Sequence, residues 1–179
     1  MKSFIFLILA AGLGLTSCSS GYVYFTESLR EQENWTESDL KRIQFYLSRD
    51  IVLTRSLGTG ETSIQEGKVI VKDGRKTERV VVPAFTPGVV VLSPEAQRLA
   101  VSFEEGGRES FLMFGPNPNN NNRYSLLAQT WYSDYGDVNY QGKLYSADAE
   151  CAYASLMVDL RRTGQEPAQT HRAKGRRIK

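Results

Sequence analysis

A succession of short β-type segments, separated by turn residues, is the feature that most limits how this chain can fold. Between Asp50 and Tyr145, runs of β-branched and aromatic residues recur about every ten residues, a spacing typical of small all-β domains. Asp73-Gly74 joins two of these runs, and this dipeptide is the strongest short signal for a β-hairpin. The expected strands are Ile51–Leu57, Lys68–Lys72, Lys76–Val82, Val89–Leu92, Leu99–Phe103, Phe111–Phe114, Tyr124–Trp131, Val138–Tyr140 and Lys143–Tyr145.

Strands that follow one another this closely predict an antiparallel meander. Glu105-Gly106-Gly107-Arg108 and Gln141-Gly142 supply two further tight turns. Pro83, Pro87 and Pro94 divide the strands into two groups. We therefore expect a mainly β (α+β) fold, with a small meander that is barrel-like or forms a strongly curled sheet.

Two amphipathic helices are expected to flank the strands. The first is Glu37–Ser48, where Thr36 is the N-cap, Asp39 completes a capping box, and apolar residues recur at i, i+3 and i+7. The second is Ala147–Arg162, which begins after Ser146 and has a broad apolar face.

The first residues of the chain have the organisation of an export signal. Lys2 precedes an uncharged, mostly apolar run, Phe4–Thr16. The run is shorter than the about 20 residues of a membrane-spanning helix and fits the apolar region of a secretory signal. It ends in Leu15-Thr16-Ser17-Cys18, a branched apolar residue and two small residues before a cysteine. This motif resembles the lipobox of bacterial lipoproteins.

The resemblance implies a specific modification of Cys18. In bacterial lipoproteins the motif cysteine receives a diacylglycerol on its thiol, and a dedicated peptidase cuts before it, here between Ser17 and Cys18. The new amino group can then receive a further acyl chain such as palmitate. Each buried methylene contributes about 0.8 kcal/mol, so two or three chains hold a protein firmly on a membrane. Ser19 follows, rather than the aspartate that retains such proteins in the inner membrane, so the resemblance implies the outer membrane, facing the periplasm.

The expected domain organisation has four parts. Residues 1–17 form a cleaved signal peptide, residues 18–34 a lipidated linker, and residues 35–163 a single mainly-β domain. The aromatic side chains of the linker are expected to pack on the body, and the alternative is that they lie at the membrane interface. Residues 164–179 lack apolar periodicity and are expected to be a disordered basic tail. Export makes nucleic acid an unlikely partner for this tail, which leaves anionic lipids, acidic envelope polymers, an acidic protein face, or a purely solvated role. Its cations are Arg172, Lys174, Arg176, Arg177 and Lys179.

The composition argues against several kinds of chemistry. The chain has two cysteines and one histidine, and the histidine lies in the tail. A disulfide framework, a cysteine-rich metal site and a histidine-based catalytic centre in the body are therefore not expected. No cofactor is predicted, and Cys151 is expected to be a buried free thiol.

One segment carries residues suited to binding. Three aromatic side chains and two carboxylates lie close together between predicted strands, and aromatic faces beside acceptors are suited to stacking on sugars or gripping a peptide. The alternative is that the aromatic residues complete the core while the carboxylates serve a turn. The residues are Trp131, Tyr132, Asp134, Tyr135 and Asp137.

These features favour a lipid-anchored cell-envelope protein with a non-enzymatic binding or assembly role at the outer membrane. One alternative is a small β-barrel that binds an apolar or carbohydrate ligand. A second alternative is a hydrolase that works through paired carboxylates, such as Asp134 and Asp137.

Overall fold

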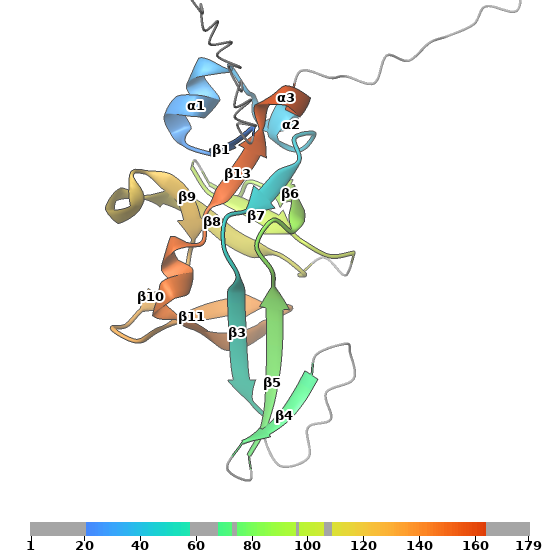
Figure 1. Ribbon diagram of the computed structural model, residues 1–179, viewed down its shortest axis with the longest axis vertical. Helices are drawn as coiled ribbons and strands as arrows, with labels where there is room; N and C mark the ends of the chain where they lie inside the picture. Colours follow the sequence, from blue (N-terminus) through green and yellow to red (C-terminus); the bar gives the residue numbers. More distant parts are fainter. Residues whose placement is uncertain (1–20, 58–67, 73–74, 96, 106–108, 164–179) are drawn as a thin grey trace, which may run out of the picture.

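The computed structural model describes residues 21–57, 68–72, 75–95, 97–105 and 109–163, and over these residues the fold is mainly β. The described strands form two antiparallel sheets (Figure 1). The seven-stranded sheet contains, in spatial order, β1 (Tyr22–Tyr24), β13 (Leu156–Asp159), β2 (Phe45–Leu47), β6 (Pro87–Leu92), β7 (Leu99–Ser102), β8 (Leu112–Asn117) and β9 (Arg123–Leu126). The six-stranded sheet contains β10 (Thr130–Trp131), β11 (Tyr135–Tyr140), β12 (Lys143–Asp148), β3 (Ile51–Ser56), β5 (Arg75–Val82) and β4 (Lys68–Lys72).

Helical structure in the described residues is limited to short segments. These are α1 (Glu27–Gln32), α2 (Glu37–Leu40), α3 (Leu160–Thr163) and the 3-10 turns η1 (Pro118–Asn120) and η2 (Ala149–Tyr153).

A long antiparallel ribbon connects the two sheets. Strands β2 and β3 form one side of it, and β5 and β6 form the other. Phe45 lies opposite Gly88 in the seven-stranded sheet, and Ile51 lies opposite Val82 in the six-stranded sheet. From the first pair to the second, each chain segment is six residues long, from 45 to 51 on one side and from 88 to 82 on the other. The two segments therefore keep the same pairing register across the bend. The bend falls between Pro83 and Pro87, two of the prolines that divide the strands into two groups.

The seven-stranded sheet curls back on itself without closing. The backbone N–H of Tyr124 in β9 donates to the carbonyl of Phe25, just after β1, over 3.0 Å. Leu126 N–H donates to the carbonyl of Ala154 over 2.9 Å. No closed ladder forms among the residues that the structure describes, so of the two expected arrangements the barrel-like one is wrong. The fold is two open sheets.

The segment expected to be a linker contributes to the core from Gly21 onward. Thr26 caps α1 through its side chain, and Phe25, directly before it, is fully buried. The Phe25 ring meets Phe45 and Tyr124 edge to face, with centroids 5.2 Å and 4.7 Å away. The expected packing of this segment on the body is confirmed, and the folded unit begins before Trp35.

The helix expected at Glu37–Ser48 is wrong beyond its first turn. The capping box is present: Asp39 N–H donates to the Thr36 hydroxyl, and the Asp39 carboxylate accepts from Thr36 N–H. The helix nevertheless ends at Leu40, and Phe45–Leu47 is β2, buried on both faces between β13 and β6. A short strand that is buried on both faces lacks the alternation of apolar and polar residues by which a sequence distinguishes a strand from a helix.

The helix expected at Ala147–Arg162 is wrong for the same reason. Ser146 and Ala147 belong to β12, where they pair with β3. The five residues of η2 follow, and then β13, whose four residues are all buried between β1 and β2. The flanking helices of the expected fold are therefore replaced by central strands.

The hairpin predictions are better supported. Lys72 pairs with Arg75, as a two-residue connection at Asp73-Gly74 requires, although these two residues lie outside the described ones. Tyr140 pairs with Lys143, and the turn between them has positive φ at Gln141 (52°) and Gly142 (69°), as a type I′ turn does.

The expected strand Tyr124–Trp131 is divided between β9 and β10, which belong to different sheets. Three residues of the Glu105–Arg108 turn lie outside the described residues.

Candidate functional site

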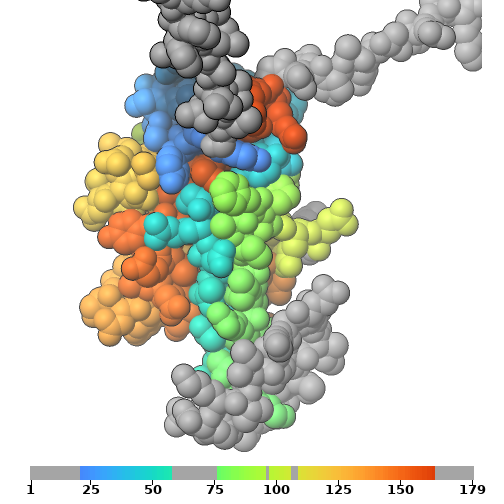
Figure 2. Space-filling model, in the orientation of Figure 1, coloured from blue at the N-terminus to red at the C-terminus, as the bar shows by residue number. Residues whose placement is uncertain are grey.

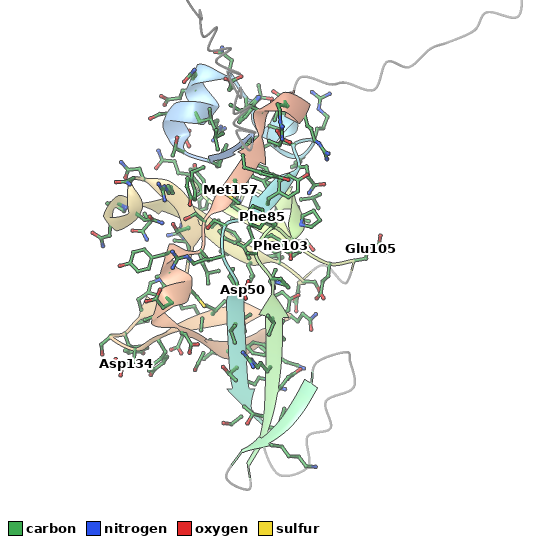
Figure 3. The ribbon with its side chains drawn as sticks, in the orientation of Figure 1. Asp50, Phe85, Phe103, Glu105, Asp134 and Met157 are labelled. Atoms are coloured by element: carbon green, nitrogen blue, oxygen red, sulfur yellow. The ribbon has the colours of Figure 1, made fainter. Side chains whose placement is uncertain are left out.

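The predicted aromatic segment is a tight hairpin between β10 and β11. Trp131 lies opposite Gly136, and Tyr132 N–H donates to the Tyr135 carbonyl over 2.8 Å. Asp134 is at the tip of the hairpin, far from the bend between the two sheets (Figure 3). The five candidate residues are therefore brought together on one short element.

Two tyrosines form the exposed part of this hairpin. The rings of Tyr132 and Tyr135 are stacked, with centroids 4.6 Å apart and planes inclined by 27°. Their exposed fractions are 48% and 40%. A stacked pair loses little side-chain entropy when it binds, because each ring already restricts the other. The pair therefore offers a preformed apolar contact with hydroxyl groups at its edge.

Trp131 supports the hairpin from behind. A Cβ atom added at Gly136 would lie 2.3 Å from Cε3 of the Trp131 indole, so the ring rests directly against the glycine backbone. The indole is half-buried and packs against the hydrophobic core. For Trp131, the alternative expected from the sequence, completion of the core, is the one observed.

The two carboxylates differ in their surroundings. Asp134 is exposed, and its backbone carbonyl accepts from Ala149 N–H over 3.1 Å, which ties the tip of the hairpin to η2. Asp137 is half-buried, and its carbonyl accepts from Gln129 N–H over 2.7 Å. The backbone of both residues therefore fixes the hairpin, and their carboxylates add two negative charges to the element that carries the tyrosine pair.

Two observations concern the chemistry expected of the body. Cys151 is a buried free thiol, as predicted, and burial raises its pKa, so the reactive thiolate is disfavoured. No three His, Cys, Asp or Glu side chains within the described residues approach closely enough to hold a metal ion.

A second surface was missed in the sequence. From Val81 to Val91 every second residue is apolar and exposed, and the residues between them are buried or half-buried. We call the exposed set the apolar ridge. Its members are Val81 (45% exposed), Pro83, Phe85 (57%), Pro87, Val89 (45%) and Val91 (43%).

The ridge follows one side of the ribbon that joins the sheets. Figure 2 shows residues 76–92 in green along the middle of the visible face, with the first described residues in blue directly above them. In an antiparallel sheet with one covered face, the outward positions are normally polar. Apolar residues at both inward and outward positions therefore indicate a contact surface.

Phe85 lies at the centre of the ridge in a strained conformation. Its φ is 60°, in the left-handed region that a bulky side chain rarely adopts. Two hydrogen bonds hold the loop: Phe85 N–H donates to Leu47 O, and Ala84 N–H donates to Asp50 Oδ1, both over 2.7 Å. The exposed ring meets Tyr22 edge to face at 5.7 Å. The fold thus holds an aromatic side chain in solvent at a cost in backbone energy.

A pocket of about 410 Å3 opens where β8 approaches β11. Its lining includes apolar side chains from Phe111, Met113 and Leu127. It also includes polar and charged side chains from Arg98, Glu109, Gln129 and Asn139. None of these residues was identified from the sequence, because they come from four separate segments that only the two-sheet topology brings together.

Comparison with models of known protein families, with curated proteins and with solved structures finds no match for this chain. No helix among the described residues is long and apolar enough to cross a membrane. Cys18 and the basic tail, including Arg172, Lys174, Arg176, Arg177 and Lys179, lie outside the described residues.

Proposed function

We propose that this chain is a lipid-anchored protein of the bacterial outer membrane that binds another envelope protein and performs no catalysis. The anchor is supported by the lipobox-like motif at Leu15–Cys18. The binding role is carried by one observation, the exposed and stacked pair of Tyr132 and Tyr135 on a braced hairpin.

The chemistry of the hairpin favours a peptide segment with cationic and apolar side chains. Tyrosine faces attract Lys and Arg by cation–π interaction, and Asp134 and Asp137 add negative charge beside the rings. Tyrosine is also among the residues most enriched at the energetic centres of protein interfaces. An extended basic segment crossing the tyrosine pair would use all of these groups at once.

Photo-crosslinking in cells tests this proposal. A photoreactive phenylalanine analogue in place of Tyr135 is expected to capture one reproducible envelope protein, and Tyr132→Ala is expected to reduce the yield several-fold. Tyr24 is the matched control, because it is equally exposed at 40% but lies on β1 in the other sheet. Absence of any reproducible protein adduct at Tyr135, or the same adducts at Tyr24, would contradict the proposal.

The pocket between β8 and β11 supports a second candidate function, binding of a small apolar or carbohydrate ligand. Its volume of about 410 Å3 lies in the range of ligand sites, and apolar and polar side chains both line it. Native mass spectrometry of the purified chain would detect a retained small molecule. The hydrolase alternative gains no second supporting observation, since Asp134 is exposed and the chain's one histidine lies in the tail.

A further inference from the structure

We propose that the apolar ridge is a membrane-docking face that rests on the anionic phospholipid leaflet carrying the anchor. This inference depends on the proposed lipid anchor at Cys18. It adds an orientation, in which the body lies on the membrane along the ribbon and does not hang freely from its tether.

The tether is short and leads to the ridge. Only Ser19 and Ser20 separate Cys18 from Gly21, and three residue steps of at most about 3.6 Å span about 11 Å. Tyr22 follows Gly21, and its ring contacts Phe85 at the centre of the ridge. A lipid on Cys18 therefore keeps the ridge within reach of the bilayer surface.

The two ends of the described chain lie side by side. Leu160 N–H donates to the carbonyl of Gly21 over 3.3 Å, and β1 pairs with β13 next to this bond. Figure 1 shows α3 beside the N-terminal strand at the same end of the molecule. The basic sequence after Thr163 therefore starts next to the tether, where anionic headgroups would attract its cations.

Beyond Val81, the ridge leads to positive charge. Arg79 is exposed and lies two residues before Val81 on β5, so the two residues share one face of the strand. An apolar strip with a cation beyond one end, and with the basic sequence after Thr163 starting near its centre, matches the boundary between acyl chains and anionic headgroups.

The strain at Phe85 is consistent with this role. Among the ridge residues other than the two prolines, Phe85 is the most exposed, and it is also the one held at positive φ. Residues with strained backbone conformations cluster at functional sites such as ligand clamps. Insertion of the ring between headgroups would remove it from water.

Site-directed fluorescence on vesicles tests the orientation. The lipidated protein, extracted from membranes with Cys151→Ala, is reconstituted in vesicles of phosphatidylethanolamine and phosphatidylglycerol in equal amounts. An environment-sensitive probe is attached to Val89→Cys on the ridge or to Glu105→Cys, which projects sideways from the body (Figure 3). Quenching by a lipid-borne quencher is expected to be several-fold stronger at position 89 than at position 105. The double variant Val81→Thr, Phe85→Asn is expected to abolish the difference.

The outcomes separate the two proposals. Protein that floats with the vesicles but shows equal quenching at both positions keeps the anchor and overturns docking. Protein that does not float with vesicles overturns both. A probe at position 89 that stays exposed to water on vesicles and is shielded only when envelope proteins are added assigns the ridge to a protein partner, which also overturns docking.

Discussion

Three phenylalanine residues of this protein differ strongly in burial and in backbone conformation. Phe25 and Phe45 are fully buried in one aromatic cluster, whereas Phe85 is 57% exposed and has a left-handed backbone conformation. The first two phenylalanines stabilise the fold through burial. For Phe85, the contact that offsets its strained backbone is an edge-to-face contact with the Tyr22 ring.

We predict that Phe85→Asn leaves the free energy of unfolding unchanged or raises it. Asparagine tolerates positive φ, so the substitution removes a backbone cost of about 1 kcal/mol and offsets the lost edge contact, worth about the same. Phe45→Ala is the control and is expected to lose about 3–5 kcal/mol, because its ring is fully buried. Urea denaturation measures both. A loss of more than about 2 kcal/mol for Phe85→Asn would show that the ring stabilises the fold instead.

The elements show how far the sequence predicts this fold. Strands joined by clear turn signals, such as β4 with β5 and β11 with β12, follow from their β-branched and aromatic residues and from the turn residues between them. The central strands β2 and β13 do not, because burial on both faces removes alternation, and their apolar residues also match a helical repeat.

The candidate sites also differ in how well the sequence predicts them. The tyrosine hairpin was predictable because its residues are contiguous in the chain. The pocket was not, since its walls come from distant segments. The apolar ridge had a signal in Val80-Val81-Val82 and Val89-Val90-Val91, which are apolar at inward and outward positions alike. The topology was needed to show which of these positions face outward.

At α2, the capping box predicts a specific pH dependence of stability. Hydrogen bonds from the Thr36 side chain and backbone, and from Arg42, hold the pKa of Asp39 at about 2, below its ordinary value of 3.8. Because the folded-state pKa is lowered, the stabilising contribution of the carboxylate is present above about pH 4 and is lost as the pH falls towards 2.

Asp39→Asn is therefore expected to lower stability near neutral pH and to flatten the decline in stability between about pH 4 and pH 2. Urea denaturation at a series of pH values measures both effects. Asp134→Asn, a change at an exposed hairpin tip, is the comparison. Parallel pH profiles for Asp39→Asn and the parent chain would contradict the role of the capping box.

At the scale of the whole molecule, two features support the proposed docking on a membrane. The ribbon of β2–β3 and β5–β6 passes through both sheets and carries the apolar ridge along one side. The two ends of the described chain meet at Gly21 and Leu160, so the proposed lipid and the basic tail belong to the same end. The tyrosine hairpin belongs to the six-stranded sheet, whereas both of these ends belong to the seven-stranded sheet.

The proposed location and the proposed membrane docking both depend on a lipid at Cys18. Intact mass spectrometry of the protein extracted from bacterial membranes tests that lipid most directly. We predict a chain that begins at Cys18, lacks residues 1–17 and carries the added mass of a diacylglycerol with or without a further acyl chain. Cys18→Ser is predicted to remain unprocessed and to lose the acyl mass. A Cys18→Ser protein with the same mature size and the same membrane fraction as the parent chain would contradict the lipid anchor.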